Sequence, residues 1–318
     1  MSAGGNPDRL LALCAEAVER TGLDLGGRIV VTEAATGAYA VTPLLAAMAG
    51  ASEVRALSRD SRYGTAREAE DAIIRLAERA GVAVQFSRVK DASLFDGADV
   101  VTNSGHLRPL DAKAISWLRP GSAVSLMYEP WELRPDEVDL EACHARGVHV
   151  AGPNEHHPDI GVFAYSGVMA VKQLLDAGVP VLGSRVLLLC DNVFASDIEQ
   201  GITALGGQVT AAGRVDAVLV ALSPRPEPVL DALAVERIRE AHPGAVLVQF
   251  WGDIERDDLA VWPPEAPDAG HMGILPSAVG ADPIVALQAG GLKVGELLTS
   301  SRPVTEAEEA LLLRVVPA

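Results

Sequence analysis

The chain has 318 residues, of which 49% are hydrophobic and only 4% aromatic, and its formal net charge is −17. This length is enough for two domains. The negative charge excludes nucleic acid and anionic membranes as partners, because both are recognised through clustered Lys and Arg. The three cysteines, Cys14, Cys143 and Cys190, form no CxxC pair. This argues against a disulfide framework or structural zinc and for a reducing cytoplasm.

The sequence also lacks the usual signals for secretion or membrane insertion. Its first twenty residues have neither a basic start nor a continuous apolar core, so we do not expect a signal peptide. No apolar run approaches the roughly 20 residues of a membrane span. We therefore expect a cytoplasmic protein that acts on a small-molecule substrate without a membrane partner. We also expect a homo-oligomer, most simply a homodimer.

From residue 28 onward, short β-rich runs alternate with longer helical patterns. A helix is predicted over 64–81, where Thr65-Ala-Arg-Glu68 matches a capping box. This alternation predicts a parallel sheet with helices on both faces. Six such strands make a complete doubly wound set. The predicted strands are 28–34, 53–58, 82–87, 99–104, 122–129 and 148–153.

A second alternation follows a long predicted helix over 158–178, and a further long helix is predicted over 282–300. A short closing helix is predicted from a second capping box, Thr305-Glu-Ala-Glu308. The strands of this part are predicted at 185–191, 208–213, 217–223 and 245–251. We therefore predict an α/β fold with two Rossmann-like, doubly wound parallel-sheet domains joined by long interdomain helices. The first domain, 1–157, is expected to bind a dinucleotide. The second, 158–318, is expected to bind the substrate and to carry the C-terminal helices, with the site in the cleft between the domains.

The connection after the first predicted strand is a degenerate dinucleotide-binding motif. Residues 35–40 fit A-x-G-x-x-A, whereas the fingerprint is G-x-G-x-x-G/A. Gly37 stands where the second glycine lets the backbone approach the pyrophosphate, but the first glycine is missing. The helix start still offers free amides to a phosphate. The candidate cofactor contacts are therefore Ala35, Thr36, Gly37, Ala38 and Tyr39; the alternative is an ordinary strand-to-helix connection.

The residues expected to contact the adenosine ribose lie roughly 20 positions beyond this turn. Here the sequence is Ser58-Arg59-Asp60-Ser61-Arg62. An acidic residue would bind the ribose diol, whereas Ser58, Arg59 and Arg62 suit a 2′-phosphate. The sequence thus favours NADP slightly over NAD, and the alternative is a solvated charged loop.

One segment carries a resemblance to known proteins: residues 97–127, GADVVTNSGHLRPLDAKAISWLRPGSAVSLM. It resembles the cofactor domains of NAD(P)-dependent dehydrogenases with paired Rossmann-like domains, such as the 2-hydroxyacid dehydrogenases, adenosylhomocysteinases and ornithine cyclodeaminases. The resemblance covers about residues 28–155 and is one of superfamily pattern. It implies a nicotinamide cofactor, with the loop of Asn103 and Ser104 near the nicotinamide ribose. The catalytic Arg, Glu and His of the hydroxyacid dehydrogenases have no matching motif here, which leaves the substrate class open.

Candidate catalytic residues are those expected beyond the carboxyl ends of the strands, where parallel sheets bind ligands. Histidine suits proton transfer because imidazole titrates near neutrality. The candidate acid–base residues are His106, Glu129, His156, His157 and His271. The candidate substrate contacts are Asn154 and Glu155 in the first domain and Asp191 and Asn192 in the second. Each of them is also compatible with an ordinary turn or surface position.

The first turn of the second alternation, CDNVFASDI at 190–198, has no glycine and is a poor phosphate cradle. This assigns the cofactor to the first domain. A metal site formed by Glu155, His156, His157 and His271 is disfavoured, because adjacent side chains diverge. No GxSxG, P-loop or HExxH motif is present.

We therefore predict an NAD(P)-dependent oxidoreductase acting on a small polar metabolite, such as a hydroxy, keto or amino acid or an imine. One alternative is a transferase or lyase that binds another adenosine-containing ligand, such as S-adenosylmethionine. The other is a non-catalytic small-molecule-binding protein.

Overall fold

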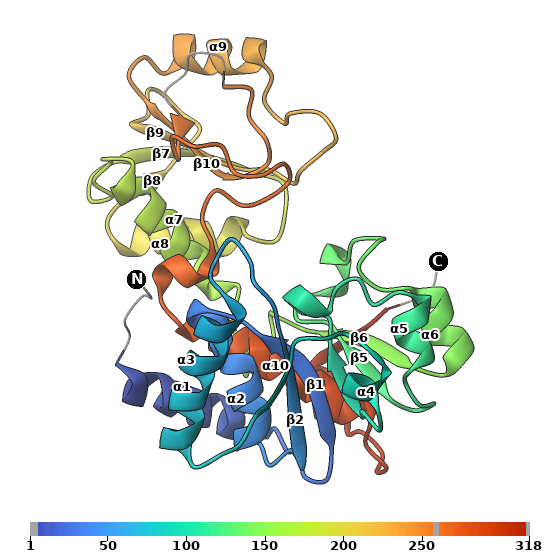
Figure 1. Cartoon of the computed structure of the whole chain (residues 1–318). Coiled ribbons are helices and arrows are strands. Elements are labelled where there is room, and N and C mark those ends of the chain that lie inside the picture. Colours follow the sequence, from blue (N-terminus) through green and yellow to red (C-terminus); the bar gives the residue numbers. More distant parts are fainter. Residues whose placement is uncertain (1–5, 257–260, 316–318) are drawn as a thin grey trace. The chain divides into compact units, whose positions relative to one another are not determined.

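The computed structural model describes residues 6–256 and 261–315. It divides the chain into two compact units (Figure 1). Unit 1 comprises Met1–Val162 and Gly280–Ala318, and unit 2 comprises Phe163–Val279. This division differs from the expected domains 1–157 and 158–318, because the C-terminal segment returns to unit 1.

Unit 1 is built on a seven-stranded sheet with the order β12-β6-β5-β4-β1-β2-β3. The strands from β1 to β6 are parallel to their neighbours, and β12 pairs antiparallel with β6. The strands are β1 (Ile29–Ala34), β2 (Glu53–Ser58), β3 (Gln85–Ser87), β4 (Val100–Thr102), β5 (Ala123–Ser125), β6 (His149–Pro153) and β12 (Leu312–Arg314). The parallel part has the 3-2-1-4-5-6 order of the doubly wound dinucleotide-binding fold. β4 and β5 are shorter than predicted, since the chain leaves the sheet early to form polar loops.

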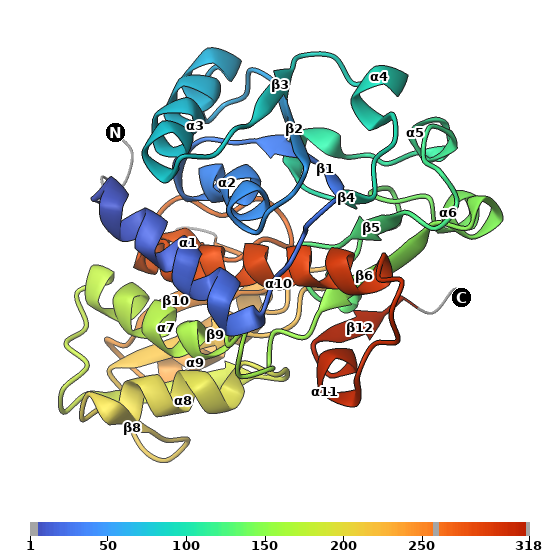
Figure 2. The same ribbon diagram turned by 90° about the horizontal axis from the view of Figure 1, so that it is seen from below.

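Helices cover both faces of this sheet. Buried apolar side chains of α1, α2 and α10 form the core on one face, and those of α4, α5 and α6 form it on the other. Figure 2 shows α10 crossing the strands with α1 alongside it. The helices are α1 (Pro7–Thr21), η1 (Gly37–Ala40), α2 (Val41–Met48), α3 (Ala66–Ala80), α4 (Ala92–Phe95), η2 (Gly105–Leu107), α5 (Ala112–Ser116), η3 (Pro130–Glu132), α6 (Leu140–Arg146), α10 (Asp282–Leu298) and α11 (Glu306–Glu309). Both predicted capping boxes, at Thr65 and Thr305, are confirmed.

Helix α10 belongs to unit 1 because its glycines let it lie directly on the sheet. A Cβ at Gly291 would come within 3.0 Å of the Met127 side chain, and one at Gly295 within 3.0 Å of Val100. No side chain fits at these positions, so the helix backbone contacts β4 and the loop after β5. The sequence pattern alone showed an apolar helix but not which sheet it would cover.

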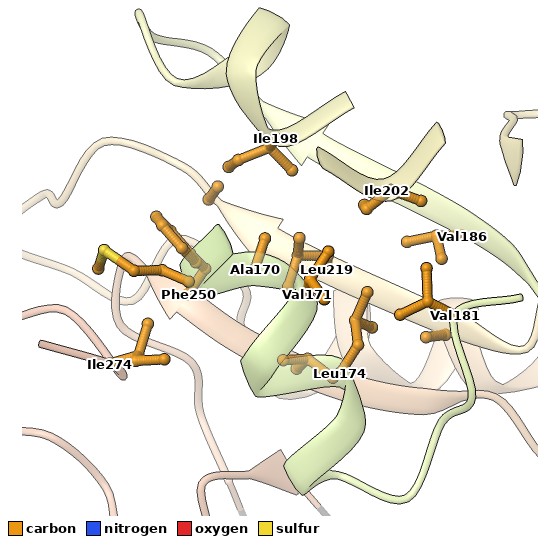
Figure 3. Close-up of a cluster of buried hydrophobic side chains, with 14 of the residues drawn as sticks. Ala170, Val171, Leu174, Val181, Val186, Ile198, Ile202, Leu219, Phe250 and Ile274 are labelled. Carbon is orange, nitrogen blue, oxygen red and sulfur yellow. The ribbon is translucent and has the colours of Figure 1, made fainter. Parts of the chain in front are cut away.

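Unit 2 contains a five-stranded parallel sheet with the order β11-β10-β9-β7-β8. This is the 2-1-3-4-5 order of the other common doubly wound sheet. Its core packs α7 and α8 against the strands through Leu174, Ile198, Ile202, Leu219 and Phe250 (Figure 3). The elements are α7 (Ala164–Asp176), β7 (Arg185–Cys190), α8 (Ala195–Ala204), β8 (Gln208–Val209), β9 (Ala217–Ala221), α9 (Ala232–Ala241), β10 (Val246–Trp251), β11 (Val261–Trp262) and η4 (Pro276–Val279).

The helix predicted over 158–178 begins six residues later, at Ala164. Residues 158–161 instead form a turn in which the amides of Ile160 and Gly161 donate to the carbonyl of His157. Across both units, the predicted class of two doubly wound parallel-sheet domains is confirmed. Within the described residues, the structure contains no helix with the length and apolar character needed to cross a bilayer.

Candidate functional site

The carboxyl edge of the unit 1 sheet gathers most of the polar residues singled out in the sequence. Doubly wound sheets bind ligands at this edge, where the strand order reverses. Here the reversal lies between β1 and β4, which are neighbours in the sheet. The loops that follow β1, β4, β5 and β6 therefore define the candidate site.

Glu33, the penultimate residue of β1, links two of these loops. Its side chain is buried, and its Oε2 accepts a hydrogen bond of 3.1 Å from the main-chain amide of His106. Burial raises the pKa of the Glu33 carboxyl, while this amide and the nearby charges of His106 and Arg108 oppose the shift. His106 itself is half-buried, and its main chain is fixed beside this buried carboxyl group. His106 is the best placed of the predicted acid–base candidates.

A buried hydrogen-bonded network connects the loop after β4 with the loop after β5. Asn103 accepts from the amide of Met127 at 2.9 Å and donates to the Tyr128 hydroxyl at 2.6 Å. Tyr128 donates in turn to Glu137. Glu137 also accepts from Arg108 Nη1 at 2.5 Å. Asn103 is fully buried and both ends of its amide are bonded, so it holds the loops together instead of facing a ligand.

Ser104, the other residue expected near a nicotinamide ribose, is also engaged by the protein. It is buried, and its hydroxyl lies 2.7 Å from that of Thr102, which in turn lies 2.9 Å from the hydroxyl of Thr32. These three hydroxyls tie the ends of β1 and β4 together. The loop backbone, not the Asn103 and Ser104 side chains, is what this edge presents.

Glu129 and Glu155 form a reciprocal clamp between the loops after β5 and β6. Glu129 Oε1 accepts from the Glu155 amide at 2.8 Å, and Glu155 Oε1 accepts from the Glu129 amide at 3.2 Å. The other oxygen of Glu129 accepts from Trp131 Nε1 at 2.8 Å. Both glutamates are buried. Glu129 therefore holds the loops in place and is a poor candidate for the predicted role in proton transfer.

Glu132, which the sequence did not single out, is the more accessible carboxyl of this group. Solvent reaches its side chain, but many protein atoms surround it. This partial desolvation, with the charge of Glu129, raises the pKa of Glu132 to about 7. Burial, reinforced by Glu132 and Glu129, holds the pKa of Glu155 well above its usual range. A group that titrates near neutrality at such an edge is suited to exchange a proton with a ligand.

The turn after β1 has the backbone that a phosphate site requires. Gly37 has φ of 66°, and a Cβ there would meet nothing within 4 Å. The turn opens η1, which runs on into α2, and the first amides of such a helical segment have no partner within it. Ala35, Thr36 and Ala38 are half-buried in the same turn. These features fit a diphosphate at Gly37.

Tyr39 is half-buried at the start of η1, not extended into solvent. Burial raises the pKa of its hydroxyl to about 12, with contributions from Glu33 and Tyr63, and Arg108 acts in the opposite direction. Tyr39 thus places a neutral hydroxyl group near Glu33 and Arg108. Its side chain does not come within 4 Å of a Cβ built on Gly37, so the space there stays open.

The loop after β2 lies next to the Gly37 turn, since Thr36 Oγ1 donates to the carbonyl of Tyr63 at 3.3 Å. Ser58 is buried and its hydroxyl donates to Glu70, which is paired with Arg88 at 2.8 Å. Ser58 is therefore committed to the protein. Arg59 and Arg62 are both exposed, and Arg62 stacks over the Tyr63 ring at 4.9 Å. Of the three residues, the two arginines are the exposed ones.

The polar residues that follow β6 are hydrogen-bonded to main-chain groups of the protein. Asn154 Nδ2 donates to the carbonyl of Ala310 at 2.9 Å, and Asn154 Oδ1 accepts from the His156 amide at 3.2 Å. His157 Nδ1 accepts from the Asp159 amide at 3.2 Å, which leaves Nε2 as the proton-bearing nitrogen of the neutral ring. His156 is exposed and His157 is half-buried.

The remaining candidates lie in unit 2. Asn192 fills its own turn after β7, because Nδ2 donates to the carbonyl of Ala221 at 2.7 Å and Oδ1 accepts from the Phe194 amide at 3.2 Å. Asp191 accepts from the Ser223 amide at 2.7 Å and adds a negative charge. This turn is therefore closed to a phosphate. His271 is exposed, and its Nδ1 lies 3.2 Å from the carbonyl of Ala269.

No metal-binding arrangement of side chains is found in residues 6–256 and 261–315. No group of three or more His, Cys, Asp and Glu side chains there is arranged to hold an ion.

A polar cavity of about 430 Å³ opens at the other end of the strands in unit 1, near Arg28, Lys293 and Arg302. These cations are bonded to protein groups, with Lys293 on Glu296 at 2.8 Å and Arg302 on Glu308 at 2.8 Å.

The sequence pattern did not single out Glu33, Arg108 or Glu137 as site residues. For Glu33 and Arg108, however, the sequence contains a feature that could have indicated them. Glu33 is a carboxylate inside an otherwise apolar strand, VVTEA, and a buried charge in a strand is costly without a purpose. Arg108 stands two residues after His106 in the same loop. Glu137 left no signal, because it approaches Arg108 only through the path of the loop after β5.

No protein-family model matches the chain, and no curated protein matches it either. Solved structures do. The D-lactate dehydrogenase TP0037 from Treponema pallidum aligns with a TM-score of 0.52 at 10% identity, covering 90% of this chain and 100% of that one. A component of dipicolinate synthase from Bacillus halodurans aligns with a TM-score of 0.50 at 11% identity, covering 88% and 100%. The chain thus shares the fold of these proteins.

Proposed function

We propose that the protein is an NAD(P)-dependent oxidoreductase that acts on a small polar metabolite at the carboxyl edge of unit 1. Two solved structures with this fold are a D-lactate dehydrogenase and a dipicolinate synthase component, which makes redox chemistry the first reaction class to test. The same proposal includes a cytoplasmic location and a homodimer, and light scattering of the purified chain tests the homodimer.

The observation that carries this proposal is the open turn at Gly37 in a sheet of order 3-2-1-4-5-6. Its left-handed φ and free space are what a backbone-bound diphosphate needs. The corresponding turn of unit 2 is filled by Asn192 and carries Asp191. Arg59 and Arg62 favour NADP over NAD, because both stay exposed on the neighbouring loop.

A bound nicotinamide would supply or accept the hydride. The protein's own part is to orient the substrate and to move a proton. The main-chain amide of His106 donates to the buried Glu33 carboxyl and the residue is half-buried, so its imidazole stands on a fixed loop and stays accessible. Glu132 is the second candidate, since it is accessible and titrates near neutrality. Both lie in unit 1, on the loops that follow β4 and β5.

Calorimetric titration of the full chain with NADH, NADPH and S-adenosylmethionine tests the proposal. We expect NADPH to bind, NADH to bind more weakly, and S-adenosylmethionine not to bind. Gly37→Asp should abolish nucleotide binding, because it places a carboxylate and a Cβ where the diphosphate lies. Gly81→Asp is the matched control, with φ of 68° and no atom within 4 Å of a Cβ, but at the end of α3.

The possible outcomes separate the candidate functions. Loss of NADPH binding in Gly37→Asp but not in Gly81→Asp supports the assigned site. Binding of S-adenosylmethionine alone would favour the transferase or lyase alternative. If none of the three ligands binds to the wild-type chain, the oxidoreductase proposal fails.

A further inference from the structure

The loop after β5 is attached to β6 and the loop that follows it at two neighbouring points. One is the clamp of Glu129 and Glu155, whose carboxyl groups each accept the other's main-chain amide, at 2.8 and 3.2 Å. The other is Gly152 in β6, where a Cβ would lie within 3.0 Å of the Tyr128 carbonyl oxygen. The Gly152 contact contains no ionisable group, so only the clamp can make this attachment depend on pH.

The hydrogen bonds of the clamp suit one ionised and one protonated carboxyl group. Both oxygens of Glu129 accept N–H groups, from Glu155 and from Trp131, as a carboxylate does. Oε1 of Glu155 accepts from the Glu129 amide, and no described residue donates to its Oε2. Both side chains are buried, and ionising both would place like charges side by side out of water. Glu155 therefore carries a proton, and the clamp holds one negative charge.

Glu132 connects this clamp to the solvent. Its main-chain amide donates to the Glu129 carbonyl at 3.0 Å, so the single turn of η3 holds Glu132 next to the clamp. Solvent reaches its side chain. Burial raises the pKa of Glu155, and the charge of Glu132 adds to that shift. An ionised Glu132 thus adds a second negative charge beside the carboxylate of Glu129.

The other charged groups on this loop offset the second charge only in part. Partial desolvation and the charge of Glu129 raise the pKa of Glu132, and Arg134 opposes them. Arg134 is 55% exposed, however, and lies 3.7 Å from Glu137. Glu137 is also paired with Arg108, from the loop after β4, at 2.5 Å. Both arginines are therefore shared with a carboxylate outside the clamp.

The loops on either side do not supply a cation that appears as the pH rises. On the turn after β1, the Tyr39 hydroxyl is neutral. On the loop after β6, His156 is exposed and His157 lies 3.7 Å from the Asp159 carboxylate. A histidine loses positive charge as the pH rises, so neither ring can neutralise a carboxylate that forms in the same range.

We propose that Glu129, Glu132 and Glu155 form a pH-sensitive latch, which holds the loop after β5 closed in mildly acidic solution and releases it as the solution becomes alkaline. In the open loop, Glu132 and Glu155 are solvated and ionise, and the two hydrogen bonds of the clamp are lost. The loop also carries Tyr128 and Glu137, so its release loosens the carboxyl edge of the unit 1 sheet. The latch works whether or not a nucleotide binds.

Hydrogen exchange of the full chain at pH 6 and pH 8, followed by mass spectrometry, tests the latch without any ligand. The measured quantity is the protection of peptides with the amides of Glu129 and Glu155, relative to the intrinsic exchange rate at each pH. The pKa of Glu132 is about 7 in the closed loop against an ordinary 4.5, so the open fraction should increase about tenfold between the two pH values. Ionisation of Glu155 adds to this increase. Protection should fall by the same factor, whereas that of β9 in unit 2 should change less.

Two variants and a control separate the latch from a general effect of pH. Glu132→Gln should remove about tenfold of the pH dependence, and adding Glu155→Gln should remove the rest. Asp136→Asn, which also deletes an exposed carboxylate from the loop after β5, is the matched control and should behave as the wild type. Because Glu132 is exposed, the single variant keeps the test valid if the double variant does not fold.

Three results would each overturn the proposal. The first is equal protection of the clamp peptides at pH 6 and pH 8. The second is a loss of protection in Glu132→Gln as large as in the wild type. The third is protection as high as that of β2 in the same unit, because the loop would then open only when the whole unit unfolds.

Discussion

The carboxyl group of Glu33 occupies the space that any side chain at Gly105 would need. A Cβ built on Gly105 would lie within 3.0 Å of three atoms of that carboxyl group. The loop after β4 therefore closes onto β1 only because residue 105 is glycine. This contact brings the His106 amide to Glu33 and sets the position of the whole loop.

Gly105→Ala should destabilise unit 1 by about 2–4 kcal/mol, combining overpacking with the strain of a positive φ. Gly121→Ala is the control, with φ of 82° and no atom near a Cβ, and should cost only about 1–2 kcal/mol. Urea unfolding measures both. When Glu33→Ala is also present, Gly105→Ala should lower the free energy of unfolding only as much as Gly121→Ala does. If Gly105→Ala destabilises the wild type and the Glu33→Ala variant equally, the contact between Gly105 and Glu33 is contradicted.

Stability should fall as the pH rises from about 5 to 8, in part through Glu132. Its pKa is about 7 in the folded chain against an ordinary 4.5, so the folded state binds this proton more tightly. The stabilisation is present below about 4.5 and is lost as the pH passes through 7. Glu132→Gln should match the wild type at pH 5 and melt at a higher temperature at pH 8. Glu16→Gln, at an exposed position, serves as the control. If the melting temperatures of the wild type and Glu132→Gln change with pH in the same way, the raised pKa of Glu132 is refuted.

Lys293→Met should destabilise unit 1 by about 3–5 kcal/mol, because it leaves the buried Glu296 carboxylate unpaired. Lys293 donates to both oxygens of Glu296, at 2.9 and 2.8 Å, and to the carbonyl of Gly22 at 2.7 Å. Arg67→Met removes an exposed pair with Asp71 in the same unit and should cost less than about 1 kcal/mol. Chemical denaturation compares the two. Similar costs would show that the Lys293 pair is not buried in solution.

Asn192→Ala should lower the stability of unit 2 by about 1–3 kcal/mol while leaving NADPH affinity unchanged. The side chain satisfies the carbonyl of Ala221 and the amide of Phe194, and both lose their partner. Thermal melting and NADPH titration of the same sample give the two readouts. A clear loss of NADPH affinity would move the cofactor from unit 1 to unit 2.

The fold was predictable because its signals are local. Each strand of the unit 1 sheet from β1 to β6 lies within a predicted run, and both capping boxes are formed as Thr65 and Thr305 indicated. The C-terminal segment is the exception: the sequence pattern places it in the second domain, whereas in the structure it belongs to unit 1. Its placement depends on glycines that fit Met127 and Val100, a long-range packing effect with no local pattern.

The candidate site was predictable in its location but less so in its residues. His106 and Gly37 lie where the strand ends predicted. Asn103, Ser58 and Glu129 lie there too, but their side chains are bonded to the protein. Sequence shows where a polar residue falls along the chain. It does not show whether its hydrogen bonds are already satisfied, and that decides between a ligand contact and a structural role.

The return of α10 to the first sheet imposes an order on biosynthesis. While a ribosome is still producing unit 2, the parallel strands β1 to β6 of unit 1 are already made but lack the helix that covers one face. Unit 2 can finish folding first, and the uncovered apolar face must meanwhile avoid aggregation or be held by a chaperone.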